Sequence, residues 1–134
     1  MRITGRVVAV IGGFAALAIL AGCGAEGGPA DPRLSAEAQL GRQAFQDLGC
    51  GSCHGDHREG KRSAPVLAGL ADHWTQPSLA TYLEDPPAMI KTTPRLAYKA
   101  EQYPIAMPTY GDKADEATLF ALAAYLLIDQ SGTP

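Results

Sequence analysis

The 134-residue chain is poor in the residues that build multi-ligand metal sites and disulfide frameworks, with only three cysteines and three histidines. It has no internal repeat, and its one long apolar run falls short of the roughly 20 residues that a transmembrane helix requires. Charged residues make up only 19% of the chain, and the formal net charge is −3. This mild acidity argues against nucleic acid as a partner. The length suits one small domain.

The N-terminus predicts an export signal. A positive segment containing Arg2 and Arg6 precedes residues 7–20, which carry no charged or polar side chain. That run ends in Leu-Ala-Gly-Cys23, which looks like a bacterial lipobox, a motif at which the signal is removed and the cysteine acylated. We therefore predict a signal peptide over 1–22 and a flexible tether over 23–33 that starts at a lipidated Cys23. An ordinary signal with a cysteine nearby is the alternative.

Five residues in the middle of the chain carry a chemical signature. Cys50-Gly51-Ser52-Cys53-His54 has the spacing that attaches c-type haem, because one backbone turn presents both thiols to the porphyrin edge and the imidazole to the iron. A thioredoxin-like dithiol would need a βαβ pattern, which the surrounding sequence lacks. A structural zinc site would need four ligands, and only His57 and His73 remain outside the motif, at unsuitable spacings. The motif favours one covalent haem c.

Apolar periodicity predicts helices on both sides of this motif. An amphipathic helix is expected over 35–48, with Gly41 placed for the close approach of another helix. A short helix capped by Ser78 is expected over 78–85 and should stop at Pro86-Pro87, with Trp74 packed near it. The last helix should start at Asp112 or Asp115 and reach about Asp129. Residues 88–111 contain three prolines and are predicted to be irregular and to line the haem.

The order of these signals resembles class I cytochrome c from about Ser35 to Ser131. The resemblance is carried by Gly41 and Phe45, the haem motif, Pro65-Val66-Leu67, Thr81-Tyr82-Leu83, Pro104-Ile105-Ala106-Met107-Pro108 and Ala124-Tyr125-Leu126. It implies that 34–134 form a small all-α cytochrome c domain whose first and last helices cross, with Phe45 and Tyr125 beside Gly41. It also implies that the carbonyl of Pro65 accepts a hydrogen bond from His54, the proximal iron ligand.

The resemblance assigns the second axial position to Met107, which lies in a proline-rich loop and directly precedes Pro108. Met89 is the competitor, although an isolated methionine is more often core filler than a ligand. His57 is too close to His54 to reach the opposite face, and His73 would serve only in a different fold. A histidine–methionine pair raises the reduction potential and leaves no position for dioxygen.

These features predict a one-electron carrier of a respiratory or photosynthetic chain, without an enzymatic activity of its own. The alternative is the haem-bearing subunit of a periplasmic dehydrogenase or of a larger membrane oxidoreductase complex. We expect an exported protein, anchored by lipid to a bacterial membrane facing the periplasm or the cell exterior, with redox proteins as donor and acceptor. Its basic residues form either a solvated surface or a collar that steers an acidic partner. They are Arg58, Lys61, Arg62, Lys91, Arg95 and Lys99.

Overall fold

The computed structural model describes residues 30–129, and the fold of this part is all-α, as predicted. Its elements are α1 (Ala36–Asp47), α2 (Gly51–His54), the 3-10 helix η1 (Leu70–Asp72), α3 (Gln76–Glu84), α4 (Pro86–Thr92), α5 (Pro94–Ala100) and α6 (Glu116–Leu127). An isolated bridge between Lys61 and Ala64 is the strand-like pairing in this range. The predicted signal peptide over 1–22, the lipidated Cys23 and most of the tether lie outside the described residues. Among 30–129, no helix has the length and apolar character needed to cross a bilayer.

The two longest helices begin at side-chain caps. The hydroxyl of Ser35 accepts a hydrogen bond from the Ala38 N–H at 3.1 Å and starts α1. A carboxylate oxygen of Asp115 accepts one from the Thr118 N–H at 2.8 Å and starts α6. Of the two predicted starts of the last helix, Asp115 is therefore the correct one. The helix ends at Leu127, slightly before the predicted end.

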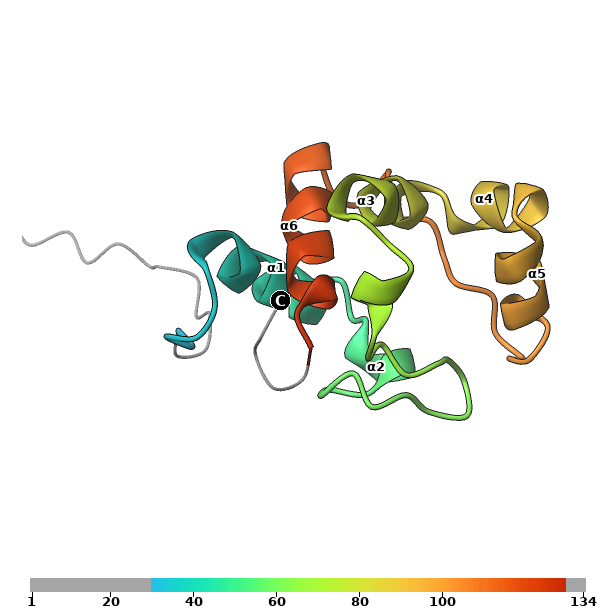
Figure 1. Ribbon diagram of the computed structural model, residues 1–134, viewed down its shortest axis with the longest axis horizontal. Coiled ribbons are helices and arrows are strands. Elements are labelled where there is room, and N and C mark those ends of the chain that lie inside the picture. The colour runs from blue at the N-terminus through green and yellow to red at the C-terminus, as the bar shows by residue number, and fades with distance from the viewer. Residues whose placement is uncertain (1–29, 130–134) are drawn as a thin grey trace, which may run out of the picture.

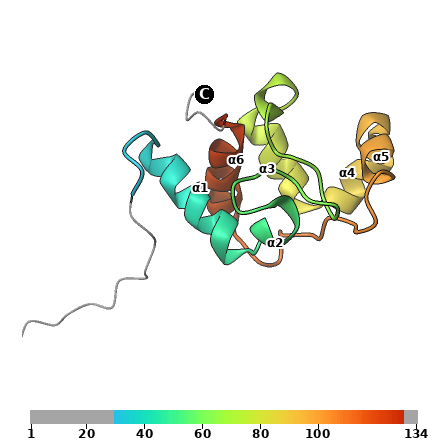
Figure 2. The same ribbon diagram turned by 90° about the horizontal axis from the view of Figure 1, so that it is seen from below.

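Helices α1 and α6 cross at a glycine. A Cβ at Gly41 would overlap the carbonyl oxygen of Ala121 and would lie 2.8 Å from Cβ of Tyr125, so only glycine allows this approach. Beside the crossing, the rings of Phe45 and Tyr125 pack edge to face with centroids 5.8 Å apart. Figures 1 and 2 show the two helices side by side in both views. The predicted close approach at Gly41 is confirmed.

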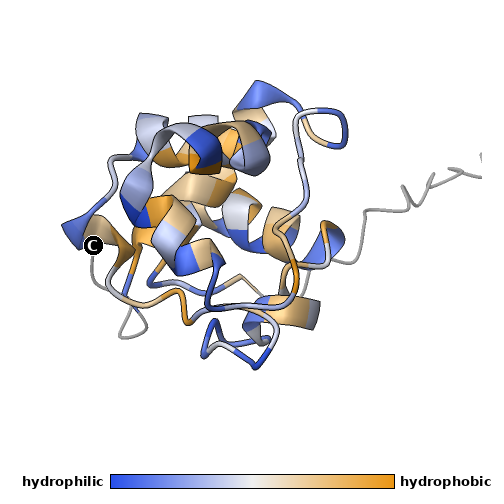
Figure 3. Cartoon of the chain, turned by 90° about the vertical axis from the view of Figure 1, so that its right-hand side faces the viewer, coloured by the Kyte–Doolittle hydropathy of each residue, from blue (hydrophilic) through white to orange (hydrophobic). Residues whose placement is uncertain are grey.

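The interior of the fold is a cluster of buried side chains, which we call the core cluster. Its central residue on α6, Leu122, is completely buried. Hydrophobic segments lie where helices pack together and hydrophilic ones on the outer loops (Figure 3). The members of the core cluster are Ala44, Phe45, Cys50, Leu79, Leu83, Tyr110, Leu119, Leu122, Ala123 and Leu126. Because Cys50 belongs to it, the first cysteine of the haem motif is part of the hydrophobic core.

Residues 86–100 correct one prediction. The segment 88–111 was expected to be irregular, but α4 and α5 occupy much of it, and each begins with a proline. Proline suits the first turn of a helix because its missing N–H has no intrahelical acceptor there. Pro86 therefore ends α3 and starts α4, with Asp85 as the cap that accepts from the Ala88 N–H.

The start of α3 also differs from the prediction. Thr75, not Ser78, is the N-cap, and the two side chains form a reciprocal capping box in which Ser78 occupies the third position of the helix. The ring of Trp74 packs against Tyr82 of this helix with centroids 5.1 Å apart, as expected. Helices α4 and α5 lie at the end of the molecule away from α1 (Figures 1 and 2).

Candidate functional site

The haem-attachment motif forms a single helical turn that follows α1 almost immediately. Cys50 has helical backbone angles, and its carbonyl accepts hydrogen bonds from the N–H groups of Cys53 and His54 at 3.3 and 3.0 Å. Cys50 and His54 are each only 8% exposed, and Cys53 is half-buried. Both cysteines are free thiols. One compact turn thus presents two thiols and one imidazole.

The imidazole is oriented by a backbone acceptor. Nδ1 of His54 lies 2.8 Å from the carbonyl oxygen of Pro65, so the proton resides on Nδ1 and Nε2 is left as the ligand nitrogen. Burial lowers the pKa of the imidazole, and the hydrogen bond to Pro65 opposes that shift. The net result favours the neutral ring, which is the form that binds metals. The geometry matches the hydrogen bond that the resemblance implies for Pro65.

The loop between His54 and Leu67 holds Pro65 in place. The Gly60 N–H donates to the His54 carbonyl at 2.7 Å, and the Leu67 N–H donates to the Arg58 carbonyl at 2.9 Å. Gly60 has a φ of 81°, and a Cβ there would collide with the Pro65–Val66 backbone. The loop is therefore folded back onto the segment that orients the imidazole.

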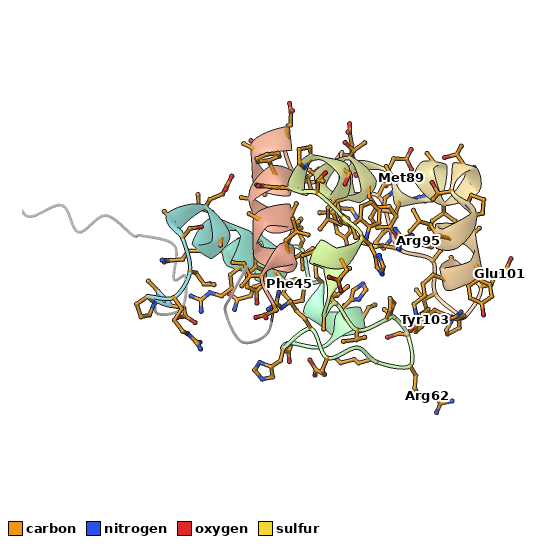
Figure 4. All side chains as sticks on the ribbon, in the orientation of Figure 1. Phe45, Arg62, Met89, Arg95, Glu101 and Tyr103 are labelled. Atoms are coloured by element: carbon orange, nitrogen blue, oxygen red, sulfur yellow. The ribbon has the colours of Figure 1, made fainter. Side chains whose placement is uncertain are left out.

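A second loop lies between α5 and α6 and contains Met107. Met107 is half-buried and packs against the core cluster, which contains Cys50. Met89 belongs to α4 (Figure 4) and is not among the side chains that pack against that cluster. The Tyr110 and Gly111 N–H groups both donate to the Glu84 carbonyl, at 3.3 and 3.1 Å. These bonds tie the Met107 loop to the end of α3.

Tyr110 joins this loop to the haem motif, a role that the sequence did not reveal. Its side chain is only 7% exposed and lies with Cys50 in the core cluster, close enough for the thiol to affect its hydroxyl. Burial and the neighbouring thiol raise the pKa of Tyr110 to about 12, and burial also raises the pKa of Cys50. Both groups are protonated at neutral pH. An aromatic residue two positions after Pro108 is compatible with many folds, so the sequence alone does not indicate that Tyr110 contacts the haem motif.

The comparison with known families decides the class of the protein. A sequence profile described as cytochrome c matches residues 38–128, more than half of the chain. The chain belongs to the cytochrome c family. No curated protein and no solved structure matches it.

As a c-type cytochrome the protein carries covalently attached haem c and serves in electron transfer. Its own residues fit that group. Two unpaired thiols and a neutral, buried imidazole lie on one turn, and a half-buried methionine packs on the same core cluster as Cys50. Within residues 30–129, no group of three or more Cys, His, Asp or Glu side chains is arranged to hold a metal ion. The zinc alternative therefore finds no support in this range.

The other histidines of the cytochrome lie outside the core. His57 and His73 are both exposed, and neither is part of the core cluster. His57 belongs to the loop just after the haem motif, and its N–H donates to Glu59 at 2.9 Å. His73 follows η1 at the surface. Their exposure agrees with their low rank as ligands in the sequence.

One basic residue of the cytochrome departs from expectation. The sequence places Arg58 with Lys61 and Arg62 in a solvated surface or a steering collar, but Arg58 is only 6% exposed, whereas the other two are exposed. Its guanidinium points into the protein towards α6, where it lies 4.6 Å above the ring of Tyr125. Arg58 is therefore a structural residue and not part of a surface collar.

Proposed function

We propose that this cytochrome is a lipid-tethered one-electron carrier of a respiratory or photosynthetic chain, with haem held by Cys50 and Cys53 and iron held by His54 and Met107. The observation that carries the proposal is the 2.8 Å contact between Nδ1 of His54 and the Pro65 carbonyl. It leaves Nε2 for the iron and makes the imidazole a stronger donor. When bound, the haem supplies a one-electron redox centre.

The packing of the second loop supports Met107 as the distal ligand. Two backbone hydrogen bonds to Glu84 and the buried Tyr110 restrain this loop, and Met107 packs against the core cluster. A restrained thioether costs little reorganisation when the iron changes charge. Thioether sulfur favours the reduced state, and a filled second position excludes dioxygen. Both properties suit a carrier of single electrons.

The surface near these residues supports protein partners. Val66, adjacent to Pro65, is 49% exposed, and Ile105, two residues before Met107, is 56% exposed. Apolar residues exposed beside both axial positions suit a short-lived contact with another redox protein. Five basic residues remain exposed after Arg58 is removed from the set, and they favour an acidic partner. They are Lys61, Arg62, Lys91, Arg95 and Lys99.

Lipid on Cys23 would confine the carrier to a membrane surface. The sequence supports this part of the proposal, because the small residues before Cys23 end the apolar run in register with a lipobox. About a dozen residues then separate the cysteine from α1. A flexible chain of n residues spans about 5–6 Å × √n, so this tether reaches roughly 20 Å. The partners would therefore lie at the same membrane surface.

Optical spectra of the full-length holoprotein test the ligand assignment. The oxidised, reduced and carbon monoxide-treated forms are recorded for the wild type, Met107→Ala and the matched variant Met89→Ala. We expect a low-spin wild type that does not bind carbon monoxide, because both axial positions are filled. Met107→Ala should bind carbon monoxide and have a lower reduction potential, whereas Met89→Ala should retain the wild-type spectrum.

Each outcome has a definite meaning. If Met89→Ala opens the iron and Met107→Ala does not, the distal ligand is Met89. If the wild type is high-spin and binds carbon monoxide, the protein has an open iron, and the carrier function is wrong.

A further inference from the structure

Arg58 is a buried charge, whereas the other arginines and all the lysines of residues 30–129 are exposed or half-buried. Within residues 30–129, the buried polar or charged side chains are His54 and Arg58. His54 is accounted for by the haem motif. Burying an arginine is unfavourable unless its donors are satisfied, so Arg58 requires a specific reason for its position.

The guanidinium of Arg58 binds the C-terminal end of α6. Its Nη1 donates to the carbonyl oxygens of Tyr125 at 2.9 Å and Ile128 at 2.7 Å, and its Nη2 lies 3.4 Å from the Asp129 carbonyl. The last carbonyls of a helix lack intrahelical donors and carry partial negative charge. A single side chain thus caps α6 from a loop about 70 residues earlier in the chain.

The backbone of Arg58 supports the segment that orients His54. Its carbonyl accepts the Leu67 N–H at 2.9 Å, and Leu67 lies two residues after Pro65, whose carbonyl binds Nδ1 of His54 at 2.8 Å. Arg58 also adopts a left-handed φ of 64°, unfavourable for a residue with a side chain. Such a conformation persists only where surrounding contacts enforce it. The carbonyls of Tyr125, Ile128 and Asp129, at and just beyond the end of α6, supply those contacts.

We propose that Arg58 is a positioning residue for the proximal ligand: by locking the loop to the end of α6, it fixes the Pro65 carbonyl against the His54 imidazole. This inference rests on the proposed role of His54 as the iron ligand. Arg58 acts on His54 through Leu67 and Pro65. Its effect is on the donor strength and ring orientation of the imidazole.

The reduction potential distinguishes an effect of the Pro65 carbonyl's position from an effect of the Arg58 charge. A looser Pro65 carbonyl makes the imidazole a weaker donor, which stabilises Fe(III) less and raises the reduction potential. Loss of a buried positive charge has the opposite sign and lowers the potential. Arg58→Lys keeps the charge but loses the planar fork that binds two carbonyls and stacks on Tyr125. A rise in potential in this variant therefore reports position alone.

The experiment compares holoprotein carrying Arg58→Lys with the wild type and with Arg62→Lys. Arg62 is the matched control, because it belongs to the same loop, is exposed and points away from the body of the protein (Figure 4). Solvent exchange of the His54 Nδ1–H proton is measured by NMR in the reduced state, together with the potential. Arg58→Lys should exchange faster by about tenfold or more, as expected for losing one charge-assisted hydrogen bond, and should have a higher potential.

The outcomes separate the possible roles. A lower melting temperature with unchanged potential and ring-proton exchange would mean that Arg58 only stabilises the fold. A changed potential in Arg62→Lys as well would mean a general surface effect, which also overturns the proposal. If the wild type binds carbon monoxide or is high-spin, the fault lies with the proposed function and not with Arg58.

A measurement on the wild type covers the case in which Arg58→Lys loses haem. Native-state hydrogen exchange gives the opening free energy of individual protons. The His54 ring proton, the Leu67 N–H and the last amides of α6 should open together with one common value, because Arg58 joins them. If the His54 and Leu67 protons open independently of the end of α6, the proposed connection does not exist.

Discussion

Replacing Gly41 with alanine tests the helix crossing on which the domain is built. The new Cβ would overlap the carbonyl oxygen of Ala121 and approach Cβ of Tyr125 to 2.8 Å, whereas ordinary contact begins near 3.4 Å. Both neighbours belong to α6, and the carbonyl is main chain, so no rotamer change removes the overlap. Helices α1 and α6 would have to separate.

The size of the effect follows from two opposing contributions. Overpacking a close contact costs about 1–3 kcal/mol, and contact with main chain places this site at the upper end of that range. Alanine regains about 1 kcal/mol because it is a better helix former than glycine. The net loss is about 2 kcal/mol, or a fall of roughly 10 °C in melting temperature for a domain of this size.

Thermal unfolding of the holoprotein, followed by circular dichroism, measures this loss. Gln46→Ala is the control, because Gln46 is exposed in the last turn of the same helix and its change should stay within about 0.5 kcal/mol. A Gly41→Ala protein that melts at or above the wild-type temperature would refute the reasoning. Helix propensity would then outweigh the contact between α1 and α6.

Two further predictions concern the ends of the domain. Cys23→Ser should move the protein from the membrane to the soluble fraction with its haem spectrum unchanged, and persistent membrane binding would contradict the lipid anchor. Asp115 caps α6, and hydrogen bonds from Thr118 lower the pKa of its carboxyl group. Because the folded pKa lies below the unfolded value of about 3.9, this stabilisation is complete above that pH and is lost as the pH falls towards the lower folded value. Asp115→Asn retains a good cap, so this variant should lose less stability than the wild type as the pH is lowered. Identical dependence of stability on pH in the two proteins would contradict the role of the Asp115 carboxylate as the cap of α6.

The outer helices and the haem motif could be predicted because each depends on local spacing. Ser35 as a cap and Gly41 as a crossing point follow from a single helical turn of sequence, and the motif from Cys50 to His54 is equally compact. Helices α4 and α5 were missed for a physical reason. Pro86 predicts the end of the preceding helix, but proline also favours the first turn of a new helix. Proline therefore occurs both where one helix ends and where the next begins.

Arg58 and Tyr110 could not be found from the sequence because their partners are distant. Arg58 binds carbonyls about 70 residues away, and nothing in the neighbouring residues distinguishes it from the exposed Arg62. Tyr110 contacts Cys50 only after the chain has folded back along α3. Such contacts belong to the tertiary structure, so a residue's own surroundings in the sequence do not encode them.

The pairing of α1 with α6 sets an order for folding. These helices lie at opposite ends of the described chain, so the core cannot close before α6 is free to pack against α1. Contacts between such distant segments also form slowly, because a long loop must close first. Until then Cys50 remains in an open chain, since its burial depends on residues of α3 and α6. The architecture therefore provides a period in which the thiols are accessible for haem attachment, and docking of α6 ends it.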